Sequence, residues 1–127
     1  MTGPGLLIDS FAWLEILKGS DRGLSALCQV MKSERRCTSV LSLYKIRYRV
    51  EQIRDPKTTD KYLSTIETNT ELLHVNDRIA RVAGDLQLPG RMLSTVDRLL
   101  LATARIHNLK LLTGDAHFSG LEDAIMV

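Results

Sequence analysis

Residues 94–118 read STVDRLLLATARIHNLKLLTGDAHF and contain a helix and a strand that together decide the fold class. Residues 98–106 are apolar on most sides of the predicted helix, which indicates that this helix is buried. Residues 109–112 form a brief apolar run of the kind that is typical of a buried strand. The run ends at Thr113-Gly114-Asp115. Taken alone, this tripeptide would be explained as a turn, because Gly tolerates positive φ angles and Asp can bond its own backbone.

The same alternation of strands and helices runs along the rest of the chain. Further strands are predicted at residues 5–8, 36–38 and 72–75, and an edge strand at 124–127. Helices are predicted at 10–17 and 24–31, and others begin after a Ser39 cap, at Pro56 and after an Asn76 cap. This pattern predicts an α/β fold whose central sheet is mainly parallel, with right-handed crossovers. Because no linker or repeat interrupts it, we expect a single domain over residues 1–127.

The composition is that of a globular protein. Its 127 residues are 44% hydrophobic and 25% charged, which does not fit a disordered chain. No apolar stretch approaches the roughly 18–20 residues of a membrane helix, and the N-terminal residues lack the features of a signal peptide. Two cysteines are too few for a disulfide framework, and the three histidines are scattered. We therefore expect a cytoplasmic protein with reduced thiols, no membrane association and no zinc site.

Three aspartates are predicted to meet at one edge of the sheet. Asp9 and Asp115 each follow a strand, and Asp97 lies in the first turn of the buried helix. Ligands bind beyond the carboxyl ends of parallel strands. Taken singly, Asp9 could cap a helix and Asp115 could belong to a turn. Asp97 fits the third helical position after a Ser94 cap, where an acidic side chain favours the helix dipole. Taken together, clustered carboxylates need a cation to offset their repulsion, and short oxygen ligands suit Mg²⁺ or Mn²⁺.

Basic residues are concentrated in two segments, although the net charge is only +2. Lys32, Arg35 and Arg36 form the first group, and Lys45, Arg47, Arg49 and Arg54 form the second. Such runs are either solvated helix faces or surfaces that contact phosphates. For the second segment we predict a nucleic-acid-binding role for Lys45, Arg47 and Arg49.

The order of these motifs resembles that of PIN domains. LLIDSFAWLEIL is similar to their opening strand and helix, TSVLSLYKIRYRVEQ to their third helix, and residues 94–118 to their closing half. The length of the chain is that of the small VapC-like toxins of this family. The resemblance implies a three-layer α/β/α sandwich and Mg²⁺- or Mn²⁺-dependent cleavage of RNA. It also implies a homodimer and an antitoxin protein that inserts into the site.

Site residues follow from the resemblance by position. Asp9, Asp97 and Asp115 would be the metal-binding catalytic acids, and Thr113 would orient them or a water molecule. Ser10 matches a small hydroxyl residue that often follows the first aspartate.

One position departs from the family pattern. PIN domains usually have a glutamate in the second turn of the third helix, and Lys45 stands there in this chain. With three aspartates and one lysine, the site carries half the negative charge that four acids would carry. Its affinity for a metal ion should therefore be lower. Glu51 lies six residues onward and should face another side of the helix. We predict that Lys45 lies within salt-bridge distance of one of the three aspartates.

Three interpretations of Lys45 follow. The protein is a degenerate PIN domain, or it still cleaves RNA and uses Lys45 to hold a phosphate, or the lysine is an engineered charge reversal. A non-catalytic module would bind RNA or an antitoxin helix without metal. For the aromatic residues, we expect at least one of Phe11 and Trp13 in the core, and core packing for Tyr44 and Tyr48 rather than stacking on RNA bases.

Other enzyme classes fit the sequence less well. A haloacid-dehalogenase phosphatase needs Asp-x-Asp after its first strand, but Ser10 and Phe11 follow Asp9. A receiver domain would have paired acids after the first strand and a lysine after the last, and this chain has neither. A nucleotide-binding loop would follow the first strand, whereas Gly3-Pro4-Gly5 precedes it.

Overall fold

The computed structural model describes residues 3–127 and contains a five-stranded sheet. Met1 and Thr2, which the predicted domain of residues 1–127 includes, lie outside this range. The strands are β1 (Leu6–Ile8), β2 (Arg36–Ser39), β3 (Glu71–Leu73), β4 (Lys110–Thr113) and β5 (Ala124–Met126). Their order is β3-β2-β1-β4-β5, and every pairing is parallel. The predicted parallel α/β sheet is therefore confirmed, with β5 at one edge.

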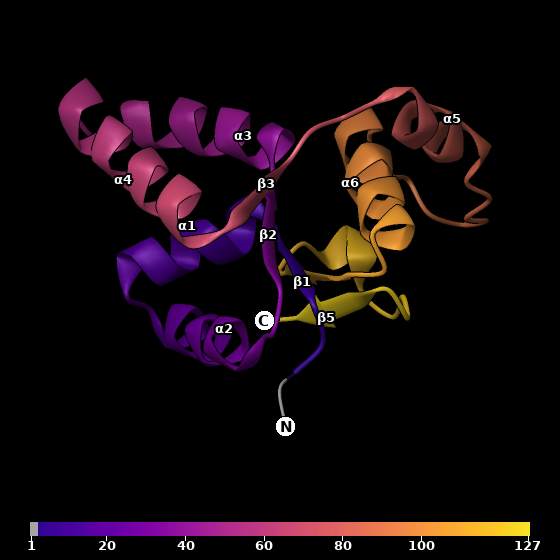
Figure 1. Ribbon diagram of the computed structural model, residues 1–127, viewed down its shortest axis with the longest axis horizontal. Coiled ribbons are helices and arrows are strands. Elements are labelled where there is room, and N and C mark those ends of the chain that lie inside the picture. Colours follow the sequence, from indigo (N-terminus) through magenta and orange to yellow (C-terminus); the bar gives the residue numbers. More distant parts are fainter. Residues whose placement is uncertain (1–2) are drawn as a thin grey trace.

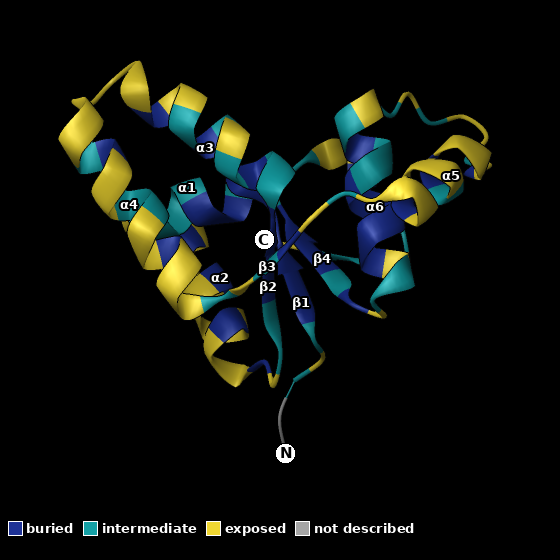
Figure 2. Ribbon diagram, turned by 45° about the horizontal axis from the view of Figure 1, so that its top comes forward, coloured by how far each residue is buried: buried dark blue, intermediate teal, exposed yellow. Residues whose placement is uncertain are grey.

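Helices cover both faces of this sheet (Figure 1). One face carries α1 (Ser10–Lys18), α2 (Asp21–Lys32), α3 (Val40–Glu51) and α4 (Pro56–Asn69). The other face carries α5 (Asp77–Asp85) and α6 (Thr95–Ile106), with a 3-10 turn, η1 (Ala116–Phe118), after β4. Figure 2 shows buried strands between helices whose outer faces are exposed. The three-layer α/β/α sandwich is confirmed.

Successive side chains of β1 enter different cores, because neighbouring residues of a strand point to opposite faces. Leu6 and Ile8 pack in a cluster with residues of α1 to α4, including Trp13 and Ile46. Leu7 belongs to the opposite cluster, which α6 and η1 complete. Because β1 packs against both cores in the middle of the sheet, the position of Asp9, which follows it, is well fixed.

Caps fix the helix starts that matter for the site. The side chain of Ser39 accepts a hydrogen bond from the backbone N–H of Leu41, and that of Asn76 accepts one from Ile79, as predicted. Asp9 itself caps α1. Such caps satisfy backbone N–H groups that have no partner within the helix.

Gly114 is needed for close packing rather than for a turn. Gly114 does not have a positive φ angle, and no turn forms at this position. A Cβ atom on Gly114 would overlap the ring of Phe11. A turn therefore does not explain this glycine: a side chain here would require the Phe11 ring to move.

The aromatic predictions have mixed outcomes. Trp13 is buried and donates a 3.1 Å hydrogen bond to the Thr38 hydroxyl, so the prediction that Phe11 or Trp13 is in the core is confirmed. Core packing of Tyr44 and Tyr48 is wrong, because they are 69% and 58% exposed. Their rings stack on each other, with centroids 6.4 Å apart, on the outer side of α3.

Among the described residues, no helix is both long enough and apolar enough to cross a membrane.

Candidate active site

Asp9 lies at the junction of β1 and α1 and is only 4% exposed. One of its carboxylate oxygens accepts a 2.7 Å hydrogen bond from the backbone N–H of Ser10, and the other accepts a 2.8 Å bond from the Thr113 hydroxyl. Burial raises the pKa of Asp9, while these hydrogen bonds and the positive charge of Lys45 act in the opposite direction. An ionised carboxylate at this buried position therefore lowers the stability of the fold.

Asp97 occupies the third position of α6 and is also 4% exposed. Its backbone N–H donates to the Ser94 hydroxyl at 3.1 Å, and its Oδ2 accepts from the Ser94 backbone N–H at 3.2 Å. The predicted Ser94 cap is confirmed, and Asp97 completes it as a capping box. The capping hydrogen bond leaves this carboxylate able to accept further bonds, because each of its oxygens has two lone pairs.

Asp115 follows β4 and begins η1. Its backbone N–H donates a 3.0 Å hydrogen bond to the Thr113 hydroxyl, so one threonine contacts both Asp9 and Asp115. Its Oδ1 lies 2.9 Å from the backbone nitrogen of His117 and 2.8 Å from the Nδ1 of the same residue. The short 3-10 turn therefore folds the imidazole back over the carboxylate.

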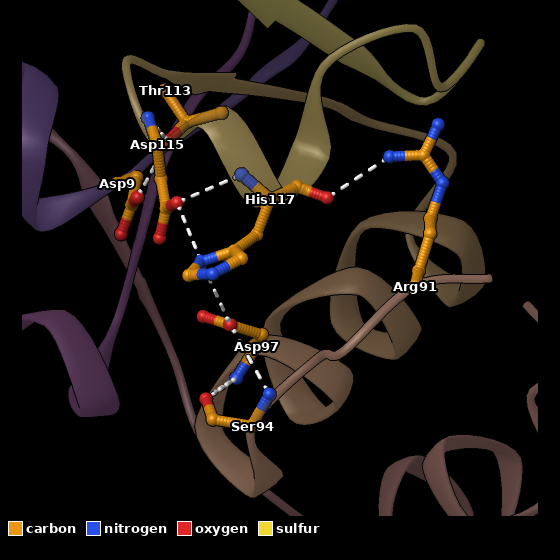
Figure 3. A network of polar contacts seen from close by, with 7 residues as sticks. All are labelled: Asp9, Arg91, Ser94, Asp97, Thr113, Asp115 and His117. Atoms are coloured by element: carbon orange, nitrogen blue, oxygen red, sulfur yellow. Dashed lines mark hydrogen bonds and ion pairs between the residues drawn. The ribbon is translucent and has the colours of Figure 1, made fainter.

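The structure brings the predicted acids together and adds His117 (Figure 3). Its Nδ1 lies 4.0 Å from Oδ2 of Asp97, so the imidazole stands between Asp97 and Asp115. One ligand atom from each of these three residues lies within 4.8 Å of the others. Asp9 lies beside Asp115, and both line one pocket. The carboxylate oxygens suit a divalent cation such as Mg²⁺ or Mn²⁺, and the imidazole nitrogen is a ligand that first-row transition ions accept.

Sequence reasoning missed His117. The predicted turn at residues 113–115 placed no 3-10 helix after Asp115, so nothing suggested that the histidine folds back. The signal was the spacing Asp115-Ala116-His117, because a tight turn can place side chains two residues apart on one side of the backbone. The structure shows that fold-back directly.

The pocket beside Asp9 and Asp115 has a volume of about 270 Å³, and its lining includes Lys45 and Arg49. These two cations are one helical turn apart on α3. Among the described residues, neither lies within 4.0 Å of a carboxylate oxygen. The predicted salt bridge of Lys45 is therefore wrong, although Lys45 faces the site and its charge opposes the effect of burial, which raises the pKa of Asp9. Its side chain lines the pocket without reaching the acids.

Arg47 differs from its neighbours on α3. It forms ion pairs with Glu51, at 2.8 Å, and with Asp60 of α4. Together with Tyr44 and Tyr48 it lines a separate open groove between α3 and α4. Glu51 is thus engaged by Arg47, and as expected it does not line the acidic pocket.

Comparisons with known proteins agree with this architecture. The family model of the PIN domain matches residues 6–123. A toxin–antitoxin complex from Klebsiella pneumoniae contains a chain that is similar in structure, with a TM-score of 0.77 and 17% identity over 96% of each chain. FitAcB from Neisseria gonorrhoeae gives a TM-score of 0.75 and 16% identity, also over 96% of each chain.

A third similar structure is Mycobacterium tuberculosis VapC20, described as a sarcin–ricin loop cleaving toxin. It has a TM-score of 0.75 and 18% identity over 93% of this chain and 95% of that one. A search of curated protein sequences gives no match. The structural similarities establish the fold, and the family model covers nearly the whole sequence. The chain belongs to the PIN domain family.

Proposed function

We propose that this protein is a divalent-metal-dependent endoribonuclease of the VapC type, acting in the cytoplasm as the toxin of a toxin–antitoxin pair. The observation that carries the proposal is the convergence of Asp9, Asp97 and Asp115 from three separate elements at the carboxyl edge of the sheet. Three carboxylates at one edge are costly unless a cation is bound there. The cleaving activity described for the similar M. tuberculosis toxin supports the choice of RNA as substrate.

The acids have distinct roles in this proposal. Asp97 and Asp115 would hold Mg²⁺ or Mn²⁺ through carboxylate oxygens, with Asp9 next to them. A bound ion of this kind offsets negative charge on a phosphodiester and lowers the pKa of water. Thr113 and Ser10 keep the Asp9 carboxylate in one orientation and leave lone pairs on both of its oxygens for a cation or a water molecule.

Lys45 and Arg49 supply the opposite charge on the pocket wall. No carboxylate within 4.0 Å competes for either side chain among the described residues. We assign them to the phosphates that flank the scissile bond, because a free ammonium or guanidinium binds phosphate oxygens strongly. Positive charge beside the acids would draw a polyanion toward a site that otherwise repels it.

A second function is favoured by the same lysine. A site in which Lys45 replaces a carboxylate has less negative charge to attract a cation, so the protein would instead bind RNA or an antitoxin without cleaving. In that case RNA binding would be the same with metal or chelator, and no cleavage would occur under either condition.

The test is cleavage of a synthetic stem-loop RNA and of total RNA, with Mn²⁺, with Mg²⁺ and with chelator. We expect the native chain to cut only with metal, and Asp115→Asn to lose at least a hundredfold in rate. Asp85→Asn, at an exposed position of α5, is the matched control and should cut normally. Cleavage that survives both the chelator and Asp115→Asn would overturn the proposal.

We also propose an antitoxin partner and a homodimer. Similar structures include toxin–antitoxin complexes, which supports the antitoxin. Exposed Tyr44 and Tyr48, with Leu43 and Leu63, give the groove between α3 and α4 an apolar surface suited to a second copy. Sedimentation of native protein and of a Tyr44→Ser/Tyr48→Ser double variant would test this: a dimer that the double variant retains would exclude that face.

A further inference from the structure

His117 has a fixed position between two candidate metal ligands. Its backbone N–H donates to the Asp115 carboxylate at 2.9 Å, and its carbonyl oxygen accepts a 3.0 Å hydrogen bond from Arg91. With the backbone held on both sides of the residue, the imidazole projects over the acids, as Figure 3 shows. Its ring is partly exposed, with 59% of the side chain accessible, so a small ion can reach it.

The spacing of the donor atoms suits one shared cation. In an octahedral site with ligand bonds of about 2.1 Å, adjacent ligand atoms lie about 3.0 Å apart and opposite ones about 4.2 Å apart. Nδ1 of His117 lies 2.8 Å from Asp115 Oδ1 and 4.0 Å from Asp97 Oδ2. These separations need only small adjustments to place all three atoms around a single ion. The imidazole would then have its proton on Nε2, which leaves the Nδ1 lone pair for the metal.

We propose that His117 binds the divalent cation through Nδ1, together with Asp97 and Asp115, and that this nitrogen ligand makes the site prefer Mn²⁺ over Mg²⁺. The inference rests on the proposed metal site and concerns which ion it selects. Mg²⁺ strongly favours oxygen ligands, whereas first-row transition ions also accept imidazole nitrogen. Because Lys45 stands where PIN domains usually have a glutamate, this site has one fewer oxygen ligand. The neutral imidazole nitrogen is therefore a larger fraction of the atoms that can bind the ion.

The competing role for His117 is structural. In that case Nδ1–H only donates a hydrogen bond to Asp115 and keeps η1 folded, and the metal never contacts the ring. Activity alone would not separate the two roles, because losing either a ligand or a fold contact lowers activity. A direct readout of nitrogen at the metal is therefore required.

The experiment is electron spin echo envelope modulation of the native chain with one equivalent of Mn²⁺. A coordinated imidazole gives a ¹⁴N modulation, and the pattern changes when the protein is made with ¹⁵N-histidine, so this comparison needs no variant. We expect the ¹⁴N signal in native protein and in His74→Asn, a control at an exposed position, and its loss in His117→Asn. By calorimetry, His117→Asn should weaken Mn²⁺ binding about tenfold or more and change Mg²⁺ binding little.

Two results would overturn the inference. Bound Mn²⁺ without a histidine ¹⁴N signal would show that the ring is not a ligand, and a signal that persists in His117→Asn would assign the nitrogen to another residue. If the same native sample still cuts RNA with Mn²⁺, only this inference fails and the ribonuclease proposal stands. If the native protein binds neither Mn²⁺ nor Mg²⁺, both fail.

Discussion

The hydroxyl of Thr113 donates a 2.8 Å hydrogen bond to the carboxylate of Asp9, a residue 104 positions away in the sequence. The two meet because β1 and β4 are neighbours in the parallel sheet, with Ile8 paired to Leu112. The same hydroxyl oxygen accepts the backbone N–H of Asp115. One fully buried side chain thus sets the relative positions of two candidate metal ligands.

Thr113→Val should destabilise the fold and misplace the acids. Valine keeps the shape of the side chain but removes the hydroxyl, which leaves a buried carboxylate with one fewer donor. We expect a loss of about 1–3 kcal/mol in the free energy of unfolding, measured by urea denaturation. Thr113→Ser, which keeps the hydroxyl, is the control and should retain most of the Asp9 orientation. A loss in Thr113→Ser without one in Thr113→Val would show that the methyl group, not the hydrogen bond, matters.

Asp9→Asn should change how stability depends on pH. Burial raises the pKa of Asp9, so the folded state holds this proton more tightly than the unfolded state does. The ionised carboxylate therefore costs stability once the pH exceeds the raised folded pKa, and the cost disappears as the pH falls below the unfolded value, near 3.8. Asparagine has no charge to bury.

We thus expect Asp9→Asn to gain stability relative to the native chain at neutral pH and to lose that advantage in acid. Urea denaturation of both proteins at a series of pH values, with chelator present, measures the difference. An advantage that grows as the pH falls would contradict the burial argument.

Lys45→Glu should strengthen metal binding. The change replaces a positive charge by a negative one at the wall of the pocket that holds Asp9 and Asp115. Even with strong solvent screening, we expect Mn²⁺ affinity to rise on the order of tenfold or more, measured by calorimetry. Lys61→Glu, an identical reversal at an exposed position of α4, should leave the affinity unchanged. A similar gain in both variants would point to a general effect of net charge.

Arg49 and Arg47 should contribute differently to RNA binding. Arg49 lines the acidic pocket and has no ion pair among the described residues, whereas Arg47 is engaged by Glu51 and Asp60. We expect Arg49→Ala to weaken binding and to reduce the slope of log affinity against log salt by about 0.7, as for one lost phosphate contact. Arg47→Ala should change the slope less. Fluorescence anisotropy with chelator present measures both, and a larger effect at Arg47 would move the RNA path to the groove between α3 and α4.

The sequence predicted the features that depend on local patterns. Asp9, Asp97 and Asp115 each stand at a strand end or a helix start, and the parallel topology brings such positions to one edge. The Ser94 cap, with Asp97 at the third helical position, could be predicted from its spacing alone.

Features that depend on packing between distant segments, or on the geometry of an irregular turn, could not be predicted. Gly114 is explained by the ring of Phe11, which approaches it from the other end of the chain. Tyr44 and Tyr48 have the spacing of a core stripe, but Ser42, Ile46 and Val50 occupy the inner side of α3. His117 joins the acids only because a 3-10 turn forms after Asp115.

Location of Mn²⁺ by anomalous diffraction, in crystals of the native chain grown with manganese, tests most directly whether Asp97 and Asp115 form a metal site beside Asp9. We expect a single strong peak in contact with both carboxylates and next to the Asp9 side chain. At saturating manganese, no peak at these carboxylates, with the Lys45 ammonium paired to Asp9 instead, would contradict the proposal. It would leave a PIN domain whose acidic edge is neutralised by its own lysine.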